Sequence, residues 1–255
     1  MRNKLCAVTL GLLVMIVPVA ARQSEDDPFT RGNRAFRLGQ YELAIFEYRQ
    51  ALAAADSRYA EVNYNLGACA YALRRNREAV NWFRAALKVR NGRYPDAAYA
   101  LGLALEELGQ PKEARAAFKQ AIEASEGRHA EAWFRYGLAL QREGQLNLAA
   151  ESYRHAAAAS GDRMPASHNN LGIILARWHR FDEAAGEFAS ALRLSKGTFD
   201  EARYNLSLCE RLRRSQPAAL LADWRIRELN SSPAVDSQQK GKSLSEEERH
   251  DLQQR

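Results

Sequence analysis

The sequence has few cysteines and lacks the strong motifs for chemistry. Only three cysteines occur in 255 residues, at Cys6, Cys69 and Cys209, and no Cys-x-x-Cys pair is present. A His-Glu-x-x-His helix and a glycine-rich phosphate loop are missing too, and His129 with Glu131 has no further ligand at metal spacing. We therefore predict no enzymatic activity, with no catalytic residue, no cofactor and no metal site.

Extremes of composition are also absent. Hydrophobic residues make up 46% of the chain, charged residues 27% and aromatic residues 9%. These values exclude collagen-like, wholly disordered and polytopic membrane proteins. The formal net charge is +6, and the arginine clusters in residues 74–77 and 211–214 are typical of solvated helix faces.

Long apolar runs are limited to one, over residues 5–19, which is shorter than the roughly 20 residues of a spanning helix. Arg2 and Lys4 precede it, and Ala20 and Ala21 close it, which is the order of a secretory signal. We predict a signal peptide over residues 1–21 and an exported protein, periplasmic or secreted, with no nucleic-acid partner and no stable membrane span. An uncleaved inner-membrane anchor is the alternative.

Glycines recur with a period of 35 residues. The series is Gly32, Gly67, Gly102, Gly137 and Gly172, with Ser207 in the sixth place. Each glycine is followed after twelve residues by an alanine, after sixteen by an aromatic residue and after nineteen by another alanine. In the first unit these are Ala44, Tyr48 and Ala51. A fixed period of this length is typical of a repeat array.

Each unit contains two helical patterns of about fourteen residues, with small and aromatic residues at i, i+3, i+4 and i+7. Gly39, Gly109 and Gly144 follow the first pattern, where a left-handed residue closes a helix. Pro95, Pro111 and Pro165 occupy first-turn positions. We predict a helical hairpin whose two helices cross closely, with the tyrosine or phenylalanine of the second helix wedged against glycine and alanine.

These residues resemble the tetratricopeptide repeat. The best single match is Trp133, Tyr136, Gly137, Leu140, Ala149 and Tyr153, and the resemblance covers about residues 25–213. It implies an all-α fold, a right-handed α-solenoid of stacked hairpins. Two features depart from the family: each unit is one residue longer, and the usual terminal proline is replaced by Asp56, Asn91, Glu126, Gly161 and Lys196.

The resemblance divides the chain into five repeats, a cap and a tail. We predict a solenoid over residues 25–229, with repeats at about 25–59, 60–94, 95–129, 130–164 and 165–199 and a capping helix pair at 200–229. Residues 230–255 are polar and are predicted to be a disordered tail. Cys69 and Cys209 fall four units apart, so we interpret both as buried residues without a bridge.

The first helix of each hairpin lines the concave face in this family, and this implies a surface for a protein or peptide partner. Aromatic rings give contact area and amides pair with an extended backbone. The alternative is that some of these rings fill gaps between units. The candidate residues are Phe29, Asn33, Phe36, Tyr64, Asn65, Tyr71, Tyr99, Leu103, Phe134, Leu138, Asn169, Ile173, Tyr204 and Asn205.

Two further features qualify this surface. One subtype of the family clamps a terminal carboxylate with cations around paired asparagines, but here Phe29, Asp96 and Ala100 stand at the cationic places, which argues against chaperone C-termini as ligands. One arginine also recurs in the turn between units: Arg58, Arg93, Arg128 and Arg163. These arginines either bind helix-end carbonyls or form a ladder for a ligand.

The sequence thus favours an exported, non-catalytic scaffold that binds a protein segment on its concave face. The alternative is an accessory subunit that docks an envelope enzyme, an export machine or a polysaccharide machine. Residues 200–206 have a short likeness to the closing segment of repeat proteins from aerotolerance operons, which motivates this second hypothesis.

Overall fold

The computed structural model describes residues 27–54 and 59–215, and all regular structure in these ranges is α-helical. The helices in chain order are α1 (Pro28–Arg37), α2 (Tyr41–Ala53), α3 (Tyr59–Ala72), α4 (Asn76–Val89), α5 (Pro95–Glu107), α6 (Pro111–Ala124), α7 (Ala130–Arg142), α8 (Leu146–Ala159), α9 (Pro165–Arg177), α10 (Phe181–Leu194) and α11 (Asp200–Ser215). The predicted signal peptide, Arg58, residues 217–229 of the cap and the predicted tail lie outside the described residues.

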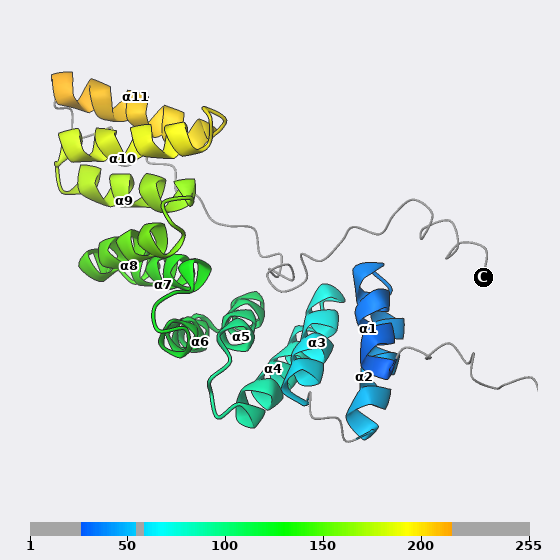
Figure 1. Cartoon of the computed structure of the whole chain (residues 1–255). Helices are drawn as coiled ribbons and strands as arrows, with labels where there is room; N and C mark the ends of the chain where they lie inside the picture. The colour runs from blue at the N-terminus through cyan, green and yellow to red at the C-terminus, as the bar shows by residue number, and fades with distance from the viewer. Residues whose placement is uncertain (1–26, 55–58, 216–255) are drawn as a thin grey trace, which may run out of the picture.

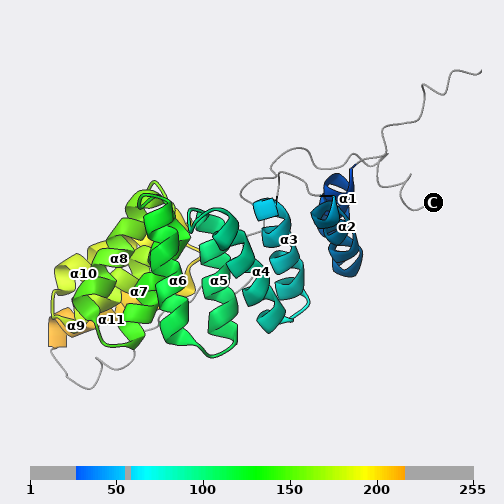
Figure 2. The ribbon, with the colours of Figure 1, turned by 90° about the horizontal axis from the view of Figure 1, so that it is seen from below.

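The helices pack in consecutive pairs, and the pairs stack along a curved row. Each helix contacts its neighbours in sequence, from α1 on α2 to α10 on α11. Figure 1 shows the row running from α1 at one end to α11 at the other, and Figure 2 shows it from below. The prediction of an all-α solenoid is confirmed. Among the described helices, none has both the length and the apolar character needed to cross a bilayer.

The two helices of each hairpin cross where the repeated glycine lies. A Cβ atom built on Gly102 would lie 2.4 Å from the Phe118 ring, and one on Gly67 would lie 2.6 Å from Phe83. The pairs Gly32 with Tyr48, Gly137 with Tyr153 and Gly172 with Phe188 are also tight. Since real Cβ contacts are not this short, only glycine permits these crossings. The predicted packing of the ring against glycine is confirmed.

The turn inside each hairpin needs one left-handed residue. Gly39, Gly109 and Gly144 take it, with φ of 73°, 70° and 77°. At the same place in the second and fifth units, Arg74 and His179 take the same conformation with φ of 59°. A side chain in this region costs roughly 1–2 kcal/mol relative to glycine. The prediction made for the three glycines is confirmed, and the two exceptions carry that cost.

The turn between hairpins explains why the terminal proline is missing. Two consecutive residues have positive φ in each described turn: Asn91 and Gly92, Glu126 and Gly127, Gly161 and Asp162, and Lys196 and Gly197. In the third unit, the second residue closes the helix by donating from Gly127 N to the Ile122 oxygen at 2.8 Å. Proline is fixed near φ of about −65° and cannot take this conformation. The absence of the family's terminal proline therefore accompanies a turn with two positive φ values.

Candidate functional site

The first helices of the units present one aromatic column, at Phe29, Tyr64, Tyr99 and Phe134. Each ring packs at an angle on the ring of the second helix in its own unit. The centroid distances are 6.0 Å for Phe29 with Tyr48, 5.8 Å for Tyr64 with Phe83, 5.8 Å for Tyr99 with Phe118 and 5.6 Å for Phe134 with Tyr153. These rings therefore support the hairpins, whatever else they contact.

The structure divides the fourteen predicted partner-binding residues into two groups. Six are half-buried and reach the surface: Phe29, Asn33, Phe36, Tyr64, Asn65 and Tyr204. Eight are buried: Tyr71, Tyr99, Leu103, Phe134, Leu138, Asn169, Ile173 and Asn205. We expected all of them on the concave surface. The buried ones face the two helices that pack on each first helix, which are the second helix of its own unit and the second helix of the unit before it.

The amides in this set bond to one another across units. The Asn33 side-chain oxygen accepts from the Tyr48 hydroxyl at 2.7 Å and from Asn65 Nδ2 at 3.1 Å. Near the other end, Asn205 Nδ2 donates to Asn169 Oδ1 at 2.9 Å. In both places an amide of one first helix joins an amide of the next. The buried pair satisfies polar groups inside the solenoid, as buried amides require.

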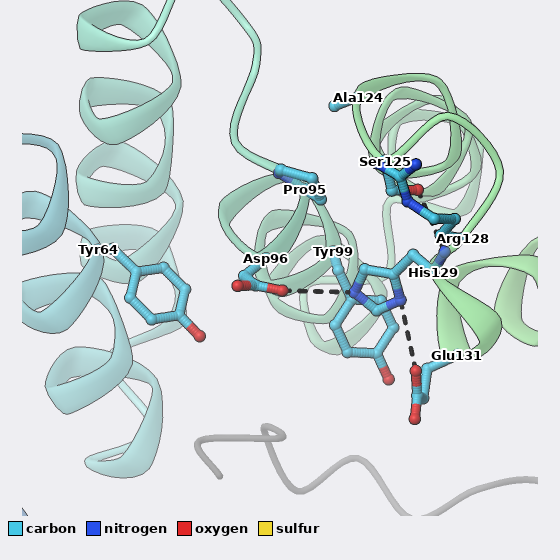
Figure 3. A pocket seen from close by; sticks show the side chains of 9 residues that line it. All are labelled: Tyr64, Pro95, Asp96, Tyr99, Ala124, Ser125, Arg128, His129 and Glu131. Carbon is cyan, nitrogen blue, oxygen red and sulfur yellow. Dashed lines mark hydrogen bonds and ion pairs between the residues drawn. The ribbon is translucent and has the colours of Figure 1, made fainter. Parts of the chain in front are cut away.

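One cavity opens on the first helices of three successive units, with a volume of about 400 Å³. Its lining comes from α3, the start of α5, the end of α6 and the start of α7. The residues are Tyr64, Pro95, Asp96, Tyr99, Ala124, Ser125, Arg128, His129 and Glu131. Figure 3 shows Tyr64 on one side and Asp96, Tyr99 and His129 on the other. The structure thus brings together two residues of the predicted set, Tyr64 and Tyr99, with Arg128 of the recurring arginines and with neighbours that were not predicted.

His129 stands at the centre of the cavity wall and is held from several sides. Its ring lies over Tyr99, with centroids 4.8 Å apart, and its Nδ1 accepts from Ala132 N at 3.2 Å. Asp96 Oδ1 is 3.7 Å from Nε2, and Glu131 Oε2 is 3.4 Å from Nδ1. Figure 3 marks both contacts with dashed lines. His129 therefore lies between two acidic side chains, one from each of two units.

The electrostatics of the wall are set by these carboxylates. The side chain of His129 holds the pKa of Glu131 below 4.5, against the opposing effect of burial. Burial raises the pKa of Tyr64, and the negative charge of Asp96 raises it further. Burial likewise raises the pKa of Tyr99, although Arg135 opposes the rise. At neutral pH the cavity thus has an ionised glutamate beside two uncharged phenols.

The sequence signal for this site was the alignment of the units. Asp96 and Glu131 stand one period apart, as Tyr64 and Tyr99 do. Sequence reasoning treated Asp96 only as a departure from a carboxylate clamp and His129 with Glu131 only as a failed metal site. Reading the aligned acids and rings as one set would have brought the cavity residues together.

Two of the recurring arginines between units, Arg128 and Arg163, make local contacts. Arg163 Nε donates to the Ser160 oxygen at the end of α8, at 3.0 Å, as expected for a structural role. Arg128 Nη1 lies 3.0 Å from the Glu126 carboxylate. Arg128 therefore pairs with an acid that does not line the cavity, although it borders the cavity itself.

In each described hairpin an aromatic ring of the second helix packs on the repeated glycine of the first, and the hairpins stack in a curved row. This arrangement defines an α-solenoid protein. Two family models, both described as tetratricopeptide repeat, match residues 58–127 and 99–163. Residues 58–163 of this chain are therefore tetratricopeptide repeats. No curated protein matches the chain at a significant level.

Several solved structures have the same fold. YrrB, described as a tetratricopeptide repeat protein with an unusual peptide-binding site, is 26% identical with a TM-score of 0.53, over 67% of this chain and 86% of its own. MamA from Desulfovibrio magneticus RS-1 is 24% identical with a TM-score of 0.56, over 68% of this chain and 98% of its own. TTC0263 from Thermus thermophilus is 23% identical with a TM-score of 0.50, over 72% and 98%. The last two likenesses concern the fold alone.

Proposed function

We propose that this chain is an exported, non-catalytic scaffold that binds an extended segment of a protein partner on the face formed by α3, α5 and α7. The observation that carries the proposal is the cavity, which is open to solvent, spans three units and is lined by rings and carboxylates. A surface shared by several units suits an extended segment, because successive side chains of the segment meet successive repeats.

Two further observations support a protein partner. Proteins of this repeat family are mostly non-catalytic scaffolds, and YrrB is described as having a peptide-binding site. The half-buried residues Tyr64, Asn65 and Asn33 lie on first helices in consecutive units. Their rings and amides suit contact with a peptide, and tyrosine loses little side-chain entropy on binding.

The test is photo-crosslinking in the native host with a benzophenone amino acid in place of Tyr64. Tyr64 is preferable to Tyr99, which is only 7% exposed. Leu148 of α8, which is 47% exposed, provides the control position outside the cavity. We expect one dominant adduct from position 64 and none from position 148. Adducts from position 148 alone would contradict binding at this face.

The captured partner separates the two hypotheses from the sequence. A partner whose crosslinked segment also binds as a synthetic peptide supports the scaffold. A membrane or catalytic subunit that co-purifies tightly but whose peptides do not bind supports the accessory-subunit alternative instead.

Export has its own test. Residues 1–21 of the native chain are expected to direct export, so the mature protein should occur in the envelope or secreted fraction and begin after Ala21. Mass spectrometry of the purified protein measures its N-terminus. An intact N-terminus in the cytoplasmic fraction would contradict export.

A further inference from the structure

We propose that the cavity between Tyr64, Tyr99 and His129 accepts a lysine or arginine side chain of the bound segment. This inference rests on the proposed function, since it names the chemistry by which the same face would recognise a partner. It follows from the shape of the cavity, the rings of its walls and the charge of its polar groups.

The first argument is shape. A volume of about 400 Å³ falls within the range of about 300–1,000 Å³ for small-molecule sites, so it admits a long side chain. The cavity lies between units, with Tyr64 from one unit, Asp96 and Tyr99 from the next and Glu131 from the third. A side chain entering here contacts all three units at once.

The second argument is the rings. Tyr64 and Tyr99 line two sides, and the imidazole of His129 packs on Tyr99 with a centroid distance of 4.8 Å. The ring of Tyr94 packs on the ring of Tyr64, with centroids 5.4 Å apart. Aromatic faces attract ammonium and guanidinium groups, by roughly 0.5–2 kcal/mol according to how far the cation is desolvated. The same faces also cover the apolar stem of a lysine or arginine.

The third argument is charge. Two carboxylates line the cavity, on Asp96 and Glu131, and Glu131 has a lowered pKa. The guanidinium of Arg128 pairs with Glu126, which is not part of the lining. The hydroxyl of Ser125 donates to the Ile122 oxygen at 2.9 Å, so its proton is engaged elsewhere. The lining therefore holds two carboxylates against one guanidinium, which is already paired with an acid outside the cavity, and this balance suits a cationic donor.

Both carboxylates also stand in the first turns of helices, α5 and α7, where acids stabilise the helix. That role accounts for an acid at either position. It does not account for the placement of rings around both acids in one cavity. A helix-terminal role predicts no preference among ligands, so the two roles are separable by binding.

The experiment uses the mature chain and fluorescent peptide pools with degenerate flanks and one fixed central residue. The fixed residues are lysine, arginine, norleucine, citrulline and glutamate, and binding is measured by anisotropy. We expect the lysine or arginine pool to bind about tenfold more tightly than its uncharged counterpart, norleucine or citrulline respectively. The variant Asp96→Asn with Glu131→Gln should lose this preference.

The matched control removes two acids elsewhere. Glu113 of α6 and Glu151 of α8 are exposed and do not line the cavity, so Glu113→Gln with Glu151→Gln makes the same change in net charge. The control should keep the preference. Thermal unfolding of both variants checks that the repeats remain folded.

The possible results separate the two proposals. Loss of the preference in the cavity variant but not in the control supports the inference. Three results overturn the inference and leave the scaffold proposal standing. They are equal binding of all pools, equal loss of the cationic preference in both variants, and displacement of every pool by putrescine without any preference for a cationic residue. No binding by any pool, together with no adduct at position 64, overturns both.

Discussion

At the scale of single residues, glycine meets two different needs in this chain. At Gly102 the need is space, because a Cβ atom would lie 2.4 Å from the Phe118 ring. At Gly109 the need is backbone conformation, since φ is 70° and no atom lies within 4 Å of the added Cβ. Gly186 has neither need: it lies in α10, is exposed and has open space around it.

The space requirement gives the first prediction. Gly102→Ala should lower the free energy of unfolding by about 1–3 kcal/mol, because Phe118 is fully buried and cannot move away cheaply. Gly186→Ala is the matched control and should raise it by roughly 0.5–1 kcal/mol through helix propensity. Chemical denaturation measures both. If Gly102→Ala were as stable as the parent protein, the crossing would not be as tight as described.

At the scale of elements, an ionised cluster ties the turn after α8 and helix α10 to α9. His168 of α9 lies with Nδ1 2.7 Å from Glu187 Oε2 and with Nε2 2.8 Å from Asp162 Oδ1. Only the protonated ring can donate from both nitrogens. The hydrogen bond with Glu187 raises the pKa of His168 above 6.5, although burial opposes the rise.

The second prediction follows from the raised pKa of His168 and concerns how the free energy of unfolding depends on pH. The folded protein holds this proton more tightly than the unfolded chain, so the contribution to stability is fully present below pH 6.5 and is lost as the pH rises through the folded-state pKa. The difference in unfolding free energy between the parent protein and His168→Gln should therefore be larger at about pH 5.5 than at about pH 9.

Denaturant titrations at both pH values measure that difference. Glu187→Gln keeps a hydrogen-bonding side chain but removes the charge, so it should reduce the same pH dependence. If the difference in unfolding free energy were larger at the higher pH, the result would contradict a protonated His168 between Asp162 and Glu187.

At the scale of the whole molecule, each helix packs on its neighbours in sequence, so stability is local along the row. Cys69 in α3 and Cys209 in α11 lie in different parts of that row, and both are buried and free. Burial raises the pKa of Cys69 to about 12 and that of Cys209 to about 11. Each thiol therefore reports on the opening of its own surroundings.

The third prediction concerns their labelling. In variants with Cys6→Ser and a single remaining cysteine, both thiols should react with a disulfide reagent at about pH 8 at least about a hundredfold more slowly than in the unfolded chain, because little thiolate is exposed. As guanidinium is added below the main transition, the two rates should rise differently. A common rate at every concentration would indicate one all-or-none unit instead of a row of locally stabilised repeats.

The sequence by itself determined the hairpin, its period and the contact that closes it. Gly102, Ala114 and Phe118 show why: their contacts lie within one unit, between helices joined by a short turn, and such contacts leave a periodic pattern. The cavity residues could be inferred only in part, since Tyr64 and Tyr99 were in the predicted set but Asp96, His129 and Glu131 were not joined to it.

Tertiary structure alone decided which side chains of the first helices remain at the surface. Tyr64 and Phe134 occupy the same place in their units, yet Tyr64 reaches the cavity and Phe134 is fully buried. Their exposure depends on which side chains of the neighbouring units pack against each ring, and those neighbours are fixed only when the units stack. A period in the sequence is a property of one unit, whereas the cover over each ring is a property of the stack.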